Sequence, residues 1–255
     1  MSRTDPTTCT ELVLVSGHAI FLGNSNSDLL SEDQWLMQPF QKQNPATNKP
    51  GEHETFVSHI LTGAFAVAGR PKALLVFSGG RTTNADRTEA EGYEQVYREL
   101  GEPFDLEGRY ALENHATDSY QNLLFSILRF RQVTGRYPEQ VTVITHAFKQ
   151  NRFLDLHATA IKWPAHRIRV LGLNPPFTSE ELRETTEGEL ERAHKLFVQD
   201  PHGLRSPLAD KRAARNFNPD EVVEWYRDLE PEVVELLKYS AGQWSSLPGR
   251  LPWEE

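Results

Sequence analysis

The stretch from Val76 to Tyr93, VFSGGRTTNADRTEAEGY, constrains the fold of this chain more than any other. It continues an apolar run that begins at Ala73, breaks at Ser78-Gly79-Gly80, and restarts with a helical pattern whose first turn is acidic. A strand, a glycine turn and a capped helix form half of a βαβ unit. Paired glycines let backbone N–H groups approach a ligand, and a helix start favours negative charge, so this corner is typical of an anion site. The alternative is an ordinary turn.

The same alternation of strand and helix patterns continues along the chain. We predict strands at residues 12–16, 73–77, 109–112, 141–145 and 168–173, and helices at 55–68, 87–100, 118–134 and 149–161. This order favours a Rossmann-like, doubly wound α/β fold with a mostly parallel sheet. We predict one domain over residues 1–255, with a core at 12–173 and a C-terminal helical extension at 177–255. The polar, proline-containing segment 24–54 is expected to form a surface insertion or lid.

Composition limits the partners of the chain. A net charge of −9 and a pI near 5.5 argue against nucleic acid and against an anionic membrane surface, because both require a basic face. The single cysteine, Cys9, excludes an internal disulfide. No apolar run reaches the ~18 residues of a membrane span, so we expect a cytoplasmic protein. The expected partner is a small anionic ligand, and the oligomeric state is left open.

Candidate site residues follow the carboxyl ends of four predicted strands, where ligands bind in open α/β sheets. We also include polar residues on the helices that come next. The predicted ligand-binding residues are Gly17, His18, Ser78, Gly79, Gly80, Arg81, Glu89, Glu113, Thr117, Asn122, Thr145, His146 and Arg152. Arg81 and Arg152 are expected to lean over the same edge, since guanidinium groups bind phosphate and carboxylate well.

Several of these residues have structural alternatives. Glu89 lies three positions after Asp86 and would then complete a capping box. Asn122 would tie down a loop, and His18 or His146 would hydrogen-bond to backbone at a strand end. Each arginine would pair with an acidic neighbour such as Glu89 or Glu113.

A metal site is not expected. His18, His115 and His146 come from separate strands and lack the short spacing of common zinc or iron ligands. Ser78 lacks the GxSxG pattern of a nucleophile elbow. Catalytic residues therefore stay unassigned.

The C-terminal extension carries charges of both signs. The acidic stretch from Thr178 to Asp200 is expected to be a helix with a solvated face. Lys211, Arg212 and Arg215 form a basic cluster within an acidic protein, which would either close over an anionic ligand or face water.

Three blocks together resemble the YdcF/SanA-like family of uncharacterised α/β proteins. They are SGGRTTNADRTEAEGY, LENHATDSYQNLLFSI and VITHAFKQNRFLDLHATAI, and they lie between about Leu12 and Leu173. The matching positions are Ser78, Gly79, Gly80, Thr88, Glu89, Ala90, Glu113, Thr117, Tyr120, Asn122, Thr145 and Arg152, whereas His146 precedes the usual histidine position. The resemblance implies a Rossmann-like fold and an adenosyl- or nucleotide-type ligand such as S-adenosylmethionine. It implies no established reaction and no certain cofactor.

The sequence therefore predicts a protein that binds an anionic or nucleotide-like small molecule at the carboxyl edge of a parallel sheet. An enzyme acting on a phosphorylated substrate is one form of this hypothesis. The alternatives are a non-catalytic sensor or scaffold of the same fold and a histidine-based, metal-assisted hydrolase.

Overall fold

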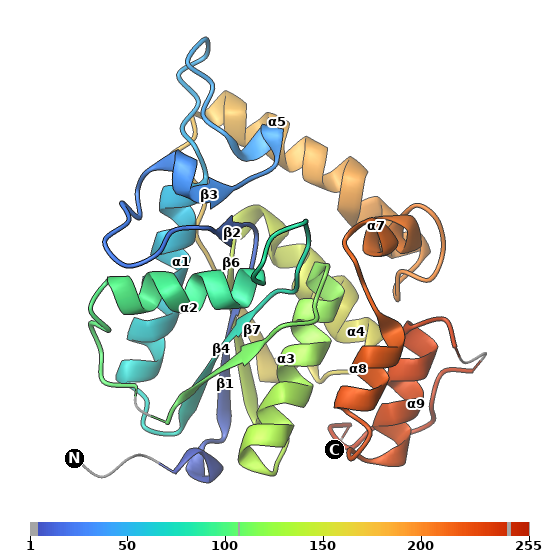
Figure 1. Cartoon of the computed structure of the whole chain (residues 1–255). Helices are drawn as coiled ribbons and strands as arrows, with labels where there is room; N and C mark the ends of the chain where they lie inside the picture. The colour runs from blue at the N-terminus through green and yellow to red at the C-terminus, as the bar shows by residue number, and fades with distance from the viewer. Residues whose placement is uncertain (1–4, 107, 244–245, 255) are drawn as a thin grey trace.

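A five-stranded parallel sheet forms the centre of the molecule in the computed structural model, which describes residues 5–106, 108–243 and 246–254. The strands are β1 (Glu11–Ser16), β4 (Ala73–Ser78), β5 (Tyr110–Glu113), β6 (Gln140–Thr145) and β7 (Ile168–Gly172). Their order is β5-β4-β1-β6-β7, and every neighbouring pair is parallel. The sheet confirms the predicted Rossmann-like α/β fold (Figure 1).

Alternate side chains of β1 supply the two faces of the sheet. Leu12 and Leu14 pack in one apolar cluster, and Val13 and Val15 pack in the other. Because successive side chains of a strand point to opposite faces, a continuous apolar run fits a strand buried on both sides. The helices α1 (His53–Ala68) and α2 (Glu89–Glu99) cover the valine face, and α3 (Ser119–Thr134) covers the leucine face.

The segment after β1 forms a cap that the sequence indicates only in outline. It contains a two-stranded antiparallel pair, β2 (Ile20–Phe21) and β3 (Trp35–Leu36). Short 3-10 helices are η1 (Pro6–Thr8), η2 (Glu32–Gln34), η3 (Pro39–Gln41), η4 (Ala147–Lys149) and η6 (Ala165–Arg167). The cap carries η2 and η3, and it lies at the carboxyl end of the sheet (Figure 1).

The predicted helix over residues 149–161 is shorter and irregular. After η4, the chain continues as a π-helix, η5 (Arg152–His157), and then α4 (Ala158–Ala160). A second π-helix, η7 (Leu190–His194), interrupts the acidic helix between α5 (Ser179–Glu189) and α6 (Lys195–Gln199). Single π-turns inside helices occur frequently at functional sites. Both of these turns lie near the carboxyl edge of the sheet.

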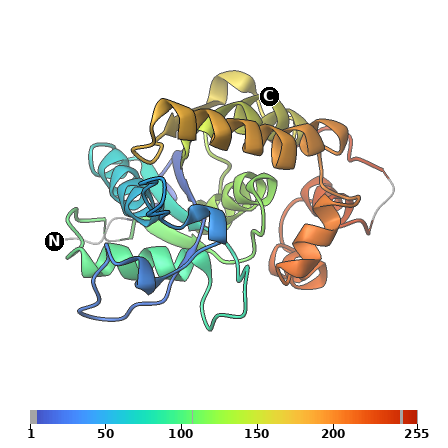
Figure 2. The ribbon, with the colours of Figure 1, turned by 90° about the horizontal axis from the view of Figure 1, so that it is seen from above.

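The C-terminal extension divides into two parts. The stretch α5-η7-α6 crosses above the carboxyl edge (Figure 2). The later helices, α7 (Leu208–Ala214), α8 (Pro219–Trp225) and α9 (Pro231–Ser240), lie beside α3, and Tyr226 donates a 3.1 Å hydrogen bond to the carbonyl of Phe125. Val222, Tyr226 and Leu236 belong to the same apolar cluster as the leucine face of the sheet. The extension therefore shares a core with the sheet.

Among the described residues, none of the helices combines the length and the apolar character that a membrane crossing needs.

Candidate functional site

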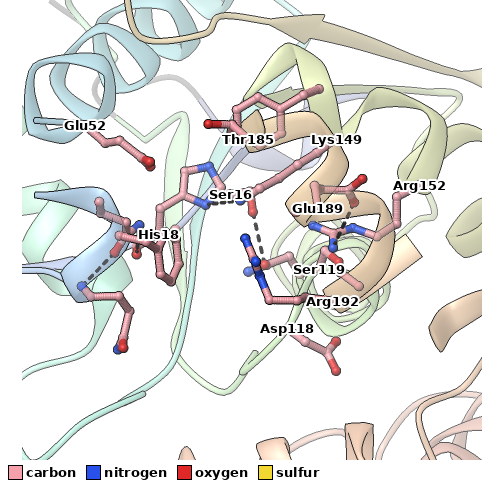
Figure 3. A pocket seen from close by; sticks show the side chains of 18 of the residues that line it. Ser16, His18, Glu52, Asp118, Ser119, Lys149, Arg152, Thr185, Glu189 and Arg192 are labelled. Atoms are coloured by element: carbon pink, nitrogen blue, oxygen red, sulfur yellow. Dashed lines mark hydrogen bonds and ion pairs between the residues drawn. The ribbon is translucent and has the colours of Figure 1, made fainter. Parts of the chain in front are cut away.

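A cavity of about 420 Å³ lies between the carboxyl edge of the sheet and the stretch α5-η7-α6. This volume is within the range of small-molecule sites. The lining comes from the end of β1, the cap, the start of α3, the η4-η5 segment, α5-η7-α6 and α7 (Figure 3). The cavity therefore lies outside the carboxyl ends of the strands, which is where open α/β sheets bind their ligands.

The floor of the cavity is fixed by a buried chain of hydrogen bonds. Ser16 at the end of β1 donates to the side-chain oxygen of Asn122 at 3.0 Å. The amide nitrogen of Asn122 donates to the hydroxyl oxygen of Ser78 at 2.9 Å, and Ser78 donates to Glu113 at 2.5 Å. These four side chains join β1, β4, β5 and α3, so Asn122 connects strands rather than a loop. Ser16 and Asn122 face the cavity, whereas Ser78 and Glu113 lie beneath it.

Glu113 is held as a buried structural group. Its second oxygen accepts from the backbone N–H groups of His115 and Ala116 at 2.6 and 3.1 Å. Burial raises the pKa of Glu113 to about 7, although these hydrogen bonds oppose the shift. With its oxygens engaged by protein donors, this carboxyl group supports the floor rather than contacting a ligand.

The glycine turn does not form the anion site that its sequence suggests. The N–H of Gly79 donates to the carbonyl of Glu113 at 3.0 Å, and the N–H of Gly80 donates to that of Ala116 at 2.6 Å. The start of α2 is capped by Thr88 and Glu91, so the proposed capping box of Asp86 and Glu89 is wrong. Because protein acceptors occupy both glycine N–H groups, this corner serves to pack β4 against β5.

Glu89 instead seals one side of the cavity. It is 7% exposed, accepts from the Thr82 hydroxyl at 2.8 Å, and burial raises its pKa. A Cβ on Gly17 would lie 2.5 Å from a carboxyl oxygen of Glu89 and 2.9 Å from the carbonyl of Ser78. Only glycine fits between them, which explains the residue at the end of β1.

A lysine and a histidine meet inside the cavity. The Nζ of Lys149 lies 3.1 Å from Nδ1 of His18 (Figure 3). The Nε2 of His18 lies 3.2 Å from the Thr145 hydroxyl. Burial holds the pKa of His18 well below its usual value, with the charge of Lys149 acting in the same direction. His18 is therefore neutral at pH 7, accepts from Lys149 and donates to Thr145.

Several cations of the cavity have no carboxylate partner. Arg152 pairs with Glu189 at 3.2 Å, and Arg212, just outside the lining, pairs with Asp118 at 2.7 Å. Within the part of the chain that the structure describes, no carboxylate oxygen lies within 4.0 Å of the cationic atoms of Lys149, Arg192, Lys211 or Arg215. These four cations therefore line one cavity without a carboxylate in direct contact.

The pKa values of Lys149 and Lys211 are both lowered, by burial and by the neighbouring cations. Burial lowers the pKa of Lys149 to about 7, and the charge of Arg152 adds to the effect. Partial desolvation lowers the pKa of Lys211 to about 8, with Arg215 and Arg152 contributing. An anion among these groups would relieve their mutual repulsion.

Six of the thirteen predicted residues line the cavity, namely Gly17, His18, Glu89, Thr117, Asn122 and Arg152. The other seven do not, namely Ser78, Gly79, Gly80, Arg81, Glu113, Thr145 and His146. The expectation that Arg81 leans over the same edge as Arg152 is not met: the Arg81 side chain is exposed. Its carbonyl accepts from Asn216, which fixes that loop near α7.

Sequence reasoning missed the contributions of the cap and of Lys149. Gln38, Phe40, Gln41, Lys49 and Glu52 reach the cavity from the cap. Gln41 donates to the carbonyl of His18 at 3.1 Å, and Lys49 donates to that of Phe40. The proline-containing segment was expected as a lid, but nothing in its pattern indicated which side chains turn inward. Lys149 follows a strand end by only four residues, which is the signal that could have identified it.

The histidines form a stack rather than a set of converging ligands. The rings of His18 and His146 lie 4.5 Å apart with a 30° angle between their planes, and His59 meets His146 edge-on at 5.0 Å. His146 Nε2 lies 3.6 Å from Glu52. His115 lies elsewhere, against Trp225. Within the described ranges, no group of three or more His, Cys, Asp or Glu side chains is arranged to hold a metal ion.

The chain is similar to the uncharacterized protein YOR238W of Saccharomyces cerevisiae. The two sequences are 27% identical in an alignment that covers 81% of this chain and 83% of the yeast protein. No family model matches the chain, and no solved structure matches it. The similarity therefore extends over most of both chains and carries no assigned activity.

Proposed function

We propose that this protein binds a phosphorylated, nucleotide-like small molecule in the cavity above β1. The observation that carries the proposal is a set of lining cations with no carboxylate oxygen within 4.0 Å among the described residues: Lys49, Lys149, Arg192, Lys211 and Arg215. They gather in one place although the chain has a net charge of −9. A surface-exposed cation costs little to leave unpaired, but partly desolvated cations that repel one another favour a bound anion.

The geometry supports phosphate as the anion. Lysine and arginine are the side chains that bind phosphate most often, and arginine does so through paired donors. Ser16, Thr117 and Asn122 form the floor beside these cations, and because their side-chain donors already bond to protein acceptors, the cations make the contacts to the phosphate. Phe40 and Phe148 add ring surfaces to the lining, which suits a ligand with an aromatic or sugar portion.

A second candidate is an adenosyl ligand with a cationic group, such as S-adenosylmethionine. It is favoured by the carboxylates Glu52, Glu181 and Glu184, which line the cavity together with the exposed ring of Phe40. This candidate also agrees with kinship to the YdcF/SanA-like family, which we propose on the three sequence blocks.

Ligand-induced stabilisation tests the proposal. Pyrophosphate, AMP and S-adenosylmethionine would each be titrated while thermal unfolding is followed. A ligand at ~100 times its dissociation constant stabilises by about 2.7 kcal/mol, and a protein of this size gains about 2–4 °C per kcal/mol. We expect a shift with pyrophosphate and a larger one with AMP.

Arg215→Gln should lose most of this shift, since the guanidinium lines the cavity and donates to the carbonyl of Thr117. Arg227→Gln is the matched control, because it removes one positive charge from an exposed position on the surface, outside the cavity lining. Equal shifts in both variants would contradict phosphate binding here, and a response to S-adenosylmethionine alone would favour the second candidate.

A further inference from the structure

Lys149 differs from the other cations of the cavity in its surroundings. Its amine is oriented by a hydrogen bond to a neutral imidazole, that of His18, and it has no carboxylate within 4.0 Å among the described residues. Arg152 on the next helical turn places a fixed positive charge close by. The amine therefore faces a ligand space in which its protonated form is disfavoured.

We propose that Lys149 is a nucleophilic amine that forms a Schiff base with a phosphorylated aldehyde or ketone bound in this cavity. The inference rests on the proposed function, because the neighbouring cations hold the phosphate. Lysines with this chemistry are activated in other proteins by desolvation or by an adjacent cation. Both conditions hold at Lys149, whose pKa falls to about 7.

The reaction conserves atoms and charge. The nitrogen lone pair attacks the carbonyl carbon, a C–N bond forms, and the carbonyl electrons move to oxygen to give a carbinolamine after proton transfer. The C–O bond then breaks, the oxygen leaves as water, the nitrogen has given up two protons in total, and a C=N bond remains. His18 accepts a hydrogen bond from the amine and fixes its direction, while its Nε2 donates to Thr145.

Proton transfer requires a group that gives up a proton and takes one back. Glu52 lines the same cavity, is 3% exposed, and interacts electrostatically with Lys149. Burial raises the pKa of Glu52. This carboxyl group can protonate the departing hydroxyl and recover a proton from the nitrogen, and it would serve as the acid and base of the step.

Pyridoxal 5′-phosphate is a suitable probe, because it carries both an aldehyde and a phosphate. The full-length protein would be mixed with it, reduced with borohydride and mapped by peptide mass spectrometry. We expect one adduct per chain, at Lys149, and protection by pyrophosphate. The adduct should form at least about tenfold faster than on surface lysines, because each unit of pKa changes the neutral fraction tenfold.

Two variants separate this inference from phosphate binding. Lys149→Arg keeps the positive charge, so pyrophosphate should still stabilise it, but the adduct should be lost; Lys149→Gln replaces it if the larger side chain prevents folding. Lys195→Arg is the matched control: Lys195 is an exposed lysine paired with Glu191 outside the cavity lining, so this variant should keep the adduct at Lys149.

The outcomes are distinct. If pyrophosphate stabilises the wild type but the adduct maps to Lys211, to Lys49 or to no residue, the Schiff-base inference fails and phosphate binding stands. If pyrophosphate gives no stabilisation and Lys149 is unmodified, both fail. An adduct at Lys149 that pyrophosphate does not prevent supports the amine chemistry and overturns the assignment of the neighbouring cations to phosphate.

Discussion

Arg152 and Glu189 meet across the cavity at 3.2 Å, and each lies next to or within a π-helical turn. Arg152 begins η5, beside the sheet, while Glu189 precedes η7, in the stretch that covers the carboxyl edge. Both side chains are about nine-tenths buried. The pair therefore connects the stretch α5-η7-α6 to the η4-η5 segment on the opposite side of the cavity. The neighbouring cations are not part of this pair.

Glu189→Gln should destabilise the free protein by about 3–5 kcal/mol, because it leaves the buried charge of Arg152 without its partner. Pyrophosphate should bind the variant more tightly than the wild type, since the anion would compensate that charge. Chemical denaturation with and without pyrophosphate measures both effects. Weaker pyrophosphate binding in the variant would show that Glu189 does not compete with the ligand for Arg152.

Anion affinity should decrease as the pH rises through 7 to 8. Lys149 and Lys211 have pKa values of about 7 and about 8, so both lose positive charge in this interval. Sulfate is the appropriate probe, because its own charge stays constant there. Titration calorimetry should show a smaller pH dependence for Lys149→Arg, whose guanidinium stays charged. An affinity that is constant from pH 6 to pH 9, roughly one unit beyond each value, would contradict this assignment.

The free energy of unfolding should depend on pH through the protonation of Glu113. Its pKa is raised from 4.5 to about 7 in the folded state, so this stabilisation is complete below 4.5 and is lost as the pH rises through 7. Relative to Glu113→Gln, the wild type should lose on the order of 3 kcal/mol between those limits. Glutamine keeps the shape and can donate to Ser78. Parallel pH profiles for the two proteins would exclude a titrating Glu113.

Gly17→Ala should destabilise the protein by about 1–3 kcal/mol or more, because the added methyl group overpacks a rigid site. It would lie 2.5 Å from Glu89 and 2.9 Å from a backbone carbonyl. Gly69→Ala is the control: at Gly69, a Cβ meets nothing within 4 Å. Urea unfolding of both variants checks this contrast. Equal midpoints would show that β1 and Glu89 move apart at little cost.

The fold was predictable because the apolar runs of the central strands β1, β4 and β6 are buried on both faces by the elements around them. The five predicted strands all exist, and none of their predicted first or last residues is more than one residue away from the position in the structure. Local pattern failed where tertiary packing decides the conformation. The π-helical turn at Arg152 and the pair β2 and β3 leave no periodic signal, because they depend on packing between segments distant in the chain: η5 packs against α3, and β2 packs against α2.

The candidate site was predictable only in its position. Strand ends identified Gly17 and His18, since parallel strands end at one edge. The glycine turn misled because a free N–H and an N–H bonded to Glu113 or Ala116 look the same in sequence. Lys149, Arg192 and Lys211 meet through long-range packing that no spacing encodes.

In the chain, α7 follows all five strands of the sheet, so the ribosome makes it after them. The last strand ends at Gly172, yet Lys211 and Arg215 enter the cavity from the helical extension about forty residues later. Domains fold as the chain emerges from the ribosome, beginning at the N-terminus. All five strands are therefore translated before the chain acquires these charges. If the cavity binds an anion as proposed, the complete set of cations exists only after translation has passed Arg215.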